Sequence, residues 1–167
     1  MISNDLENIN SLPDILFRNT KNFPTKKFLF KKKNELWSGK SYKNINKNVL
    51  TIAQSLIEKG IKKNDRVLLI STNRIEWVEI DFAIMTIGAI TVPSFVTNSV
   101  KDNIYIIKNC NPKLIVFENK KTLNLNKNIL NFFPKEKIIL IDDHEGFQSY
   151  SKLLDSNKLL KKIPNIK

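Results

Sequence analysis

The sequence contains very little cysteine, histidine and glycine. Its 167 residues include one cysteine, Cys110, one histidine, His144, and four glycines. A single cysteine excludes an internal disulfide, and one cysteine with one histidine cannot complete the ligand set of a structural zinc site. Neither residue has a motif around it that is typical of a catalytic pair. We therefore expect no metal site, and a protein of the reducing cytoplasm.

The patterns of an export signal and of a membrane span are also missing. Residues 1–10 include Asp5 and Glu7 and lack the apolar core of a signal peptide. Residues 82–100 carry no charge, but Gly88 and Pro93 interrupt them and residues 97–99 are polar. Such interruptions predict a helix end, a strand and a turn in this stretch rather than a membrane-spanning helix.

Arginine is scarce although the chain is basic. The 28 Lys and Arg residues outnumber the 16 Asp and Glu residues, for a net charge of +12, but only Arg18, Arg66 and Arg74 are arginine. The excess is also local, because residues 21–63 hold 12 Lys against two Glu (+10), whereas residues 64–118 hold five basic and six acidic residues (−1). Specific recognition of nucleic acid relies on the arginine guanidinium. We therefore expect a solvated lysine surface and no nucleic-acid partner, and peripheral association with an anionic membrane stays open.

Hydrophobic periodicity and capping residues predict alternating helices and strands. Residues 41–59 place their apolar side chains on one helical stripe, and Gly60 supplies a left-handed stop. Residues 66–70 form a continuous apolar run too short for a typical helix, which is characteristic of a strand buried on both faces. The same criteria predict a helix at 11–20, a hairpin at 28–38, helices at 73–87, 99–109 and 149–154, and strands at 89–93, 113–117 and 138–141.

This order of elements predicts an α/β fold class, with a mostly parallel sheet flanked by helices. Three parts are expected along the chain. Residues 1–40 form an N-terminal helix and a hairpin, residues 41–142 form the part in which strands and helices alternate, and residues 143–167 form a partial helix and a connection.

Two loops are candidates for the edge of a ligand site, because α/β folds bind ligands at the carboxyl ends of their strands. Ser71, Thr72 and Asn73 follow one predicted strand, and Thr97 follows the next. A structural interpretation stands beside this one. Asn73 and Glu76 would then only cap the following helix, and residues 93–99 would only connect a strand to a helix. The aromatic and methionine residues at positions 77, 82 and 85 belong either to the core or to the wall of an apolar tunnel.

Four stretches also carry motifs of a known family. They are Leu12-Pro13-Asp14-Ile15-Leu16 followed by Phe23-Pro24, Gly60-Ile61-Lys62-Lys63-Asn64-Asp65-Arg66-Val67 after the amphipathic helix that begins at Ser41-Tyr42, Ser71-Thr72-Asn73-Arg74-Ile75-Glu76-Trp77, and Gly88-Ala89-Ile90-Thr91-Val92-Pro93 with Thr97 and Ser99. In this order and at these spacings they resemble the N-terminal region of the adenylate-forming (AMP-binding) superfamily, most like long-chain fatty acyl-CoA synthetases, over residues 12–142. Two positions depart from the family pattern: Asn64 stands where glycine is usual, and Val96 where proline is usual.

The resemblance implies a two-step reaction with a fatty acid, ATP, Mg²⁺ and CoA. The fatty acid carboxylate attacks the α-phosphate of ATP to give an acyl-adenylate and pyrophosphate, and the CoA thiol then displaces AMP. This chemistry requires a glycine-rich loop for the phosphates, Mg²⁺ to offset their charge and a lysine to stabilise the transferring carboxylate. The sequence holds none of these in recognisable form, since its four glycines are isolated and no Pro-Lys-Gly follows a phosphate loop.

We therefore expect the N-terminal portion of an acyl-CoA synthetase, ending before the phosphate loop, as a truncated sequence, one half of a split gene or an excised piece. It would hold no catalytic residue and no cofactor by itself, would be inactive without a C-terminal portion, and whether it is an enzyme stays open. The alternative is an independent, non-catalytic α/β binding or interaction module with a basic surface. Coding sequence directly downstream that reads Ser/Thr-Gly-Thr-Thr-Gly-x-Pro-Lys-Gly would separate the two. Acyl chain length, the choice between CoA and a carrier protein, and oligomeric state cannot be inferred from these residues.

Overall fold

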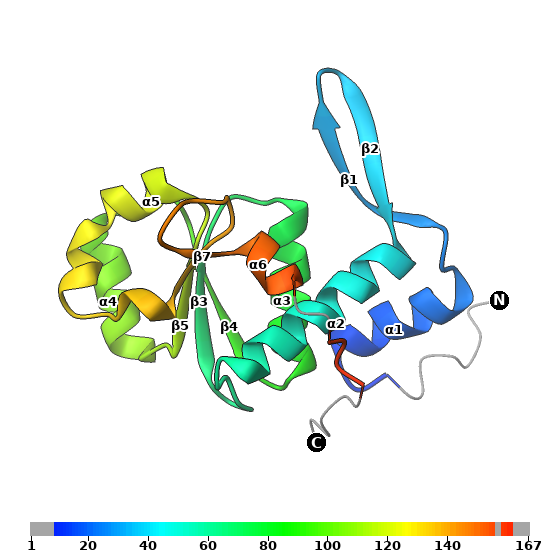
Figure 1. The fold of residues 1–167 in the computed structure, drawn as a ribbon, viewed down its shortest axis with the longest axis horizontal. Coiled ribbons are helices and arrows are strands. Elements are labelled where there is room, and N and C mark those ends of the chain that lie inside the picture. The colour runs from blue at the N-terminus through cyan, green and yellow to red at the C-terminus, as the bar shows by residue number, and fades with distance from the viewer. Residues whose placement is uncertain (1–8, 156–157, 162–167) are drawn as a thin grey trace.

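The computed structural model describes residues 9–155 and 158–161, and a five-stranded parallel sheet lies at its centre (Figure 1). All four neighbouring strand pairs are parallel. The predicted α/β class with a mostly parallel sheet is confirmed. The strand order is β4 (Ile90–Ser94), β3 (Arg66–Ile70), β5 (Leu114–Phe117), β6 (Ile138–Leu140) and β7 (Gln148–Ser149).

The central strands are apolar throughout because both of their faces are covered. Successive side chains of a strand point to opposite faces. In β3, Val67 and Leu69 belong to one hydrophobic cluster, whereas Leu68 and Ile70 belong to the other. All four side chains are 0% exposed. The continuous apolar run seen in the sequence is therefore two alternating sets of core residues.

Helices cover the two faces of the sheet in two groups (Figure 1). The first face packs against α2 (Tyr42–Glu58), α3 (Ile75–Thr86) and α6 (Tyr150–Leu154), and α1 (Leu12–Asn22) packs on the outer side of α2 and α3. The second face packs against α4 (Val100–Cys110), α5 (Lys120–Leu125) and the 3₁₀ turn at Lys127–Asn131. The longest of these helices, α2, has 17 residues. Among residues 9–155 and 158–161, no helix is both long and apolar enough to cross a membrane.

A two-stranded antiparallel hairpin projects from the part of the molecule that contains α1 and α2 (Figure 1). It consists of β1 (Lys27–Lys33) and β2 (Leu36–Ser41). Asn34 and Glu35, at the tip, both have positive φ (48° and 60°), as the tightest hairpin turns require. Leu36 and Trp37 beside the tip are 75% and 69% exposed. The hairpin thus presents large apolar side chains to the surroundings.

Most predicted helix boundaries are confirmed by their caps. Ser11, Ser41, Ser99 and Ser149 each accept a hydrogen bond from a backbone N–H of the first turn, and Ser99 forms a capping box with Asp102. Gly60 has φ +83°, the left-handed conformation expected after α2. The prediction that Asn73 and Glu76 cap α3 is wrong, because the N-cap of α3 is Arg74, whose side chain makes no capping bond.

One strand end also differs from the prediction. Pro93 was expected to end its strand, but β4 continues through it to Ser94. Proline has no N–H to donate to a neighbouring strand, and β4 lies at the edge of the sheet, where that donor is not needed.

The stretch between β5 and β6 contains structure that the sequence patterns did not reveal. Asn119 caps the short helix α5, and two 3₁₀ turns, Lys127–Asn131 and Lys135–Lys137, follow it. The two-residue strand β7 was missed as well, because two residues carry no periodic signal. The predicted C-terminal connection lies outside the described residues after Lys161. Residues 1–8, for which no export signal is predicted, also lie outside them.

Candidate functional site

The carboxyl ends of β3, β4 and β5 lie side by side. Ile70, the last residue of β3, pairs with Ser94 of β4 and with Phe117 of β5. The Glu118 N–H then donates a 2.8 Å hydrogen bond to the carbonyl oxygen of Ile70. The loops that leave these three strands therefore begin next to one another.

A pocket of about 90 Å³ opens between two of these loops. Ser71 and Asn73 line it from the loop after β3, and Pro93 and Ser94 line it from β4. Ligand sites for drug-sized molecules are roughly 300–1,000 Å³. The pocket is thus the size of a site edge and not of a complete site. Trp77 and Phe95 complete its lining.

The candidate residues fall into different positions around this pocket. The Ser71 hydroxyl is turned to its own loop and donates to the carbonyl oxygen of Thr72 at 2.9 Å. The Thr72 hydroxyl donates to the Glu118 carboxylate, which ties the loop after β3 to the loop after β5. Thr97 is exposed in the turn after β4 and does not line the pocket. The structure therefore brings Ser71 and Asn73 together and leaves Thr72 and Thr97 at the margin.

Arg74 holds the start of α3 against the end of β6. Its Nε lies 2.9 Å from Glu76 Oε2, and its Nη1 lies 2.8 Å from Asp142 Oδ1. Burial alone would lower the pKa of Arg74, but the hydrogen bonds that Arg74 donates to Glu76 and Asp142 outweigh it and raise that pKa. Burial alone would raise the pKa of Glu76, but the Arg74 partner holds that pKa below its ordinary value. Arg74 is thus already neutralised by two carboxylates.

A buried chain of amide groups, which the sequence analysis missed, supports the turn that carries Thr97. The Ser94 hydroxyl donates to Asn103 Oδ1 at 2.8 Å, and Asn98 Nδ2 donates to Ser94 Oγ at 3.0 Å. Asn103 Nδ2 continues the chain to Asn126 Oδ1 at 2.9 Å. Asn103 is 0% exposed, so these bonds satisfy polar groups that burial would otherwise make costly. The signal for it in the sequence is an asparagine one turn before Ile107, on the buried side of α4.

The aromatic residues at this edge have two roles. Trp77 is half-buried and packs against the hydrophobic cluster that contains Val67 and Leu69. Phe82, about one and a half turns later, packs against the same cluster. Trp77 also forms part of the pocket wall, together with Phe95, which is 75% exposed. Core packing is thus observed for both helical aromatics, and Trp77 additionally faces the candidate site.

Groups able to bind a metal or to act as a nucleophile are sparse. Within residues 9–155 and 158–161, no three His, Cys, Asp or Glu side chains are close enough together to bind a metal ion. Cys110, at the end of α4, is partly buried, and this burial raises the pKa of its thiol. A protonated thiol is a poor nucleophile. The edge at the strand ends offers hydroxyls and one amide, without a glycine-rich loop that could surround a triphosphate.

Solved structures share this arrangement of strands and helices. A luciferase-like enzyme from the mealworm Zophobas morio superposes with a TM-score of 0.78 at 20% identity, over 91% of this chain and 36% of that one. A fatty acid AMP ligase from Legionella pneumophila superposes with a TM-score of 0.66 at 20% identity, over 74% of this chain and 22% of that one. The fold is therefore the N-terminal part of the adenylate-forming fold.

Sequence comparisons identify the family. The profile of the AMP-binding enzyme family matches residues 16–165, and the chain belongs to that family. The long-chain-fatty-acid–CoA ligase FadD15 of Mycobacterium tuberculosis is 39% identical over 56 residues, which are 34% of this chain and 9% of that protein. The long-chain-fatty-acid–CoA ligase ACSBG2 of Xenopus laevis is 28% identical over 112 residues, which are 67% of this chain and 15% of that protein. The resemblance found in the motifs is confirmed, and the chain matches only a small part of the length of these relatives.

Proposed function

We propose that this chain supplies the N-terminal scaffold of an ATP-dependent acyl-CoA synthetase that acts on fatty acids. The observation that carries the proposal is the family match over residues 16–165, together with the likeness to two long-chain-fatty-acid–CoA ligases. In this reaction a carboxylate oxygen bonds to the α-phosphorus of ATP and pyrophosphate leaves. The CoA sulfur then bonds to the acyl carbon and AMP leaves. We infer a cytoplasmic location from the scarcity of cysteine.

The strand ends would form one border of the substrate site. Ser71 and Asn73 line the small pocket there, and Thr72 and Thr97 lie beside it. Hydroxyl and amide groups of this kind orient a polar part of a substrate, and the Trp77 ring offers an apolar surface. We assign these residues binding roles and no catalytic role.

The chemical step needs groups that this sequence does not contain. It lacks a glycine-rich phosphate loop and the lysine that would follow it. We therefore expect ATP, Mg²⁺ and CoA to be bound mainly by a further polypeptide, and little adenylation by this chain alone. The exposed apolar side chains near the hairpin tip support this view, since such surfaces are typical of contacts with another polypeptide.

ATP–pyrophosphate exchange tests the proposal. The purified chain is assayed with palmitate and Mg²⁺, once alone and once with the polypeptide encoded directly downstream. Exchange in the mixture only would support an N-terminal scaffold. Exchange by the chain alone would show that it holds the catalytic groups after all. No exchange in either assay would favour the non-catalytic binding module.

A further inference from the structure

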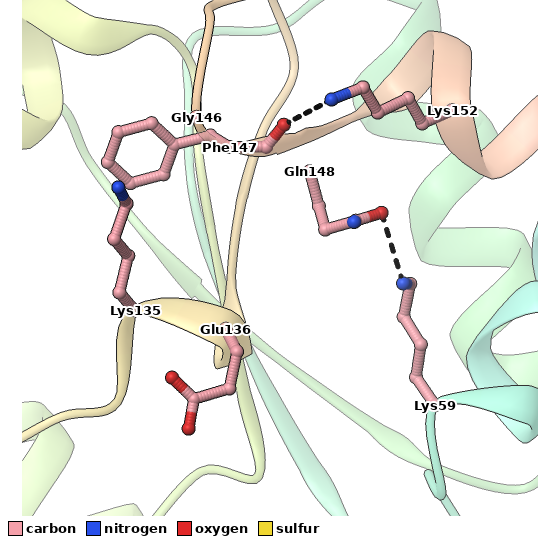
Figure 2. A pocket seen from close by; sticks show the side chains of 7 residues that line it. All are labelled: Lys59, Lys135, Glu136, Gly146, Phe147, Gln148 and Lys152. Atoms are coloured by element: carbon pink, nitrogen blue, oxygen red, sulfur yellow. Dashed lines mark hydrogen bonds between the residues drawn. The ribbon is translucent and has the colours of Figure 1, made fainter.

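A second and larger pocket lies beside the edge strand β7 (Figure 2). Its volume is about 410 Å³, which is within the roughly 300–1,000 Å³ range of small-molecule sites. The 3₁₀ turn before β6, the segment 146–148, the end of α2 and the start of α6 surround it. Both the turn and the segment lie at the amino ends of their strands. This pocket is therefore separate from the candidate site at the carboxyl ends.

Three lysines from three different elements converge on the segment 146–148 (Figure 2). Lys59 Nζ donates to Gln148 Oε1 at 3.2 Å, and Lys152 Nζ donates to the Phe147 carbonyl oxygen at 2.8 Å. Lys135 Nζ lies 4.6 Å from the centroid of the Phe147 ring. None of the acceptors carries a negative charge. Three ammonium groups are thus gathered around a neutral segment.

Positive charge outweighs negative charge in the lining of this pocket, although the Lys152 charge also helps to lower the pKa of the nearby Asp143 carboxyl, after the hydrogen bonds from Ser149 and Ser151. In the described part of the chain, none of the three lysines has a carboxylate oxygen within salt-bridge distance. Glu136 is the single acidic residue of the lining. Each ammonium has three N–H donors, and the observed bonds use one donor of Lys59 and one of Lys152. With three lysines against one glutamate the lining has a net positive charge, and a concave surface with an excess of one sign of charge concentrates counter-ions.

We propose that this pocket binds a ligand that carries two or more phosphate groups. Bonds between an ammonium and a phosphate oxygen are charge-assisted and stronger than the present bonds to a carbonyl and an amide. The three lysines surround a space larger than one phosphate group, so linked phosphates fit their arrangement. The Phe147 ring holds Lys135 in place by a cation–π contact, and a second ammonium, that of Lys120, lies 4.4 Å from the same ring.

Isothermal titration of the full chain measures this binding, with inorganic pyrophosphate in one arm and Mg²⁺-free ADP in the other. Saturable binding of either probe is expected. Tighter binding of ADP would identify the ligand class as nucleotides, and binding of pyrophosphate alone would identify it as inorganic polyphosphate. The variant K59Q/K135Q/K152Q should bind at least about tenfold more weakly, since bonds to charged groups are the stronger ones.

Matched variants make the result specific. The variant K31Q/K33Q/K101Q removes the same charge from exposed positions elsewhere and should bind within about threefold of the wild type, because screened charges a Debye length away contribute little. All the lysines are exposed, so the fold is expected to survive, and a thermal transition confirms it. No binding to the wild type, or equal weakening by both triple variants, would overturn the proposal. Neither outcome depends on the exchange assay.

Discussion

The Tyr150 hydroxyl donates a hydrogen bond to the carboxylate of Glu79, although 71 positions separate the two residues. Glu79 is 0% exposed, and Lys40 Nζ and Asn48 Nδ2 reach the same carboxylate at 3.0 and 2.9 Å. Burial and the Glu79 charge raise the pKa of Tyr150, so its hydroxyl remains a donor over the physiological range. One carboxylate thus joins β2, α2, α3 and α6.

Removal of this carboxylate should destabilise the chain strongly. Glu79→Ala leaves the Lys40 ammonium and two further donors without their acceptor; Lys40 is 33% exposed and water can reach it, whereas each buried donor left without a partner costs about 1–3 kcal/mol. Tyr150→Phe removes one bond to a charged group and should cost about 1.5–3 kcal/mol. Urea denaturation measures both. The exposed Glu58→Ala is the control and should change the free energy of unfolding by less than about 1 kcal/mol. A Glu79→Ala variant as stable as this control would contradict the assigned role.

Asn64 explains how the chain tolerates a departure from its family's pattern. Its φ is +67°, in the left-handed region where glycine is most at ease and asparagine is the next best choice. Asn64→Gly should therefore leave the thermal midpoint nearly unchanged. Asn64→Val should lower stability by about 1–2 kcal/mol, because a β-branched residue clashes in this conformation. Lys62→Val, at an exposed neighbour without positive φ, is the matched control. Equal effects of the two valines would argue against a conformational cause.

The pair of Arg74 and Glu76 predicts a pH dependence of stability. The folded-state pKa of Glu76 is lowered, so the folded state binds its proton less tightly than the unfolded chain does. This contribution is present above the ordinary pKa of 4.5 and is lost as the pH falls through the lowered value. The difference in thermal midpoint between wild type and Glu76→Gln should thus be largest near neutral pH and shrink below pH 4.5. A difference that stays constant down to pH 3 would refute the linkage.

Trp37 offers a direct report on whether a further polypeptide covers the hairpin. The sequence has two tryptophans, so Trp77→Phe leaves Trp37 as the single emitter. Trp37 is 69% exposed, and its fluorescence should be that of a solvated indole in the isolated chain. Addition of the polypeptide encoded downstream should shift the emission to shorter wavelength. The reciprocal variant, Trp37→Phe, reports on the half-buried Trp77 and should shift less. If the mixture catalyses ATP–pyrophosphate exchange but the Trp37 emission is unchanged, the added polypeptide does not cover the hairpin.

Sequence patterns predicted the central elements well because those elements depend on local rules. Serine caps, the apolar stripe of α2 and the continuous apolar run of β3 each appear within a few residues. The start of α3 was misplaced for a different reason. Arg74 is fixed by Asp142, 68 positions away, and no local pattern reveals such a partner.

The candidate site was predictable only in its location. The position of Ser71 and Asn73 follows from the rule on strand ends, and the structure does bring them to one pocket. The bond between Thr72 and Glu118, and the buried contacts of Asn103, join segments whose proximity is decided by the whole sheet. The lysine-lined pocket beside β7 was missed for the same reason, since Lys59, at the end of α2, and Lys152, in α6, are 93 positions apart in the chain.

The two edge strands of the five-stranded sheet are both poor templates for polymerisation. A fibril grows when an edge strand presents an unbroken row of N–H and C=O groups to the next copy. At one border, Pro93 within β4 removes a donor from that row. At the other border, β7 is only two residues long. This chain therefore carries its own protection against stacking into cross-β assemblies, even while its hairpin stands uncovered.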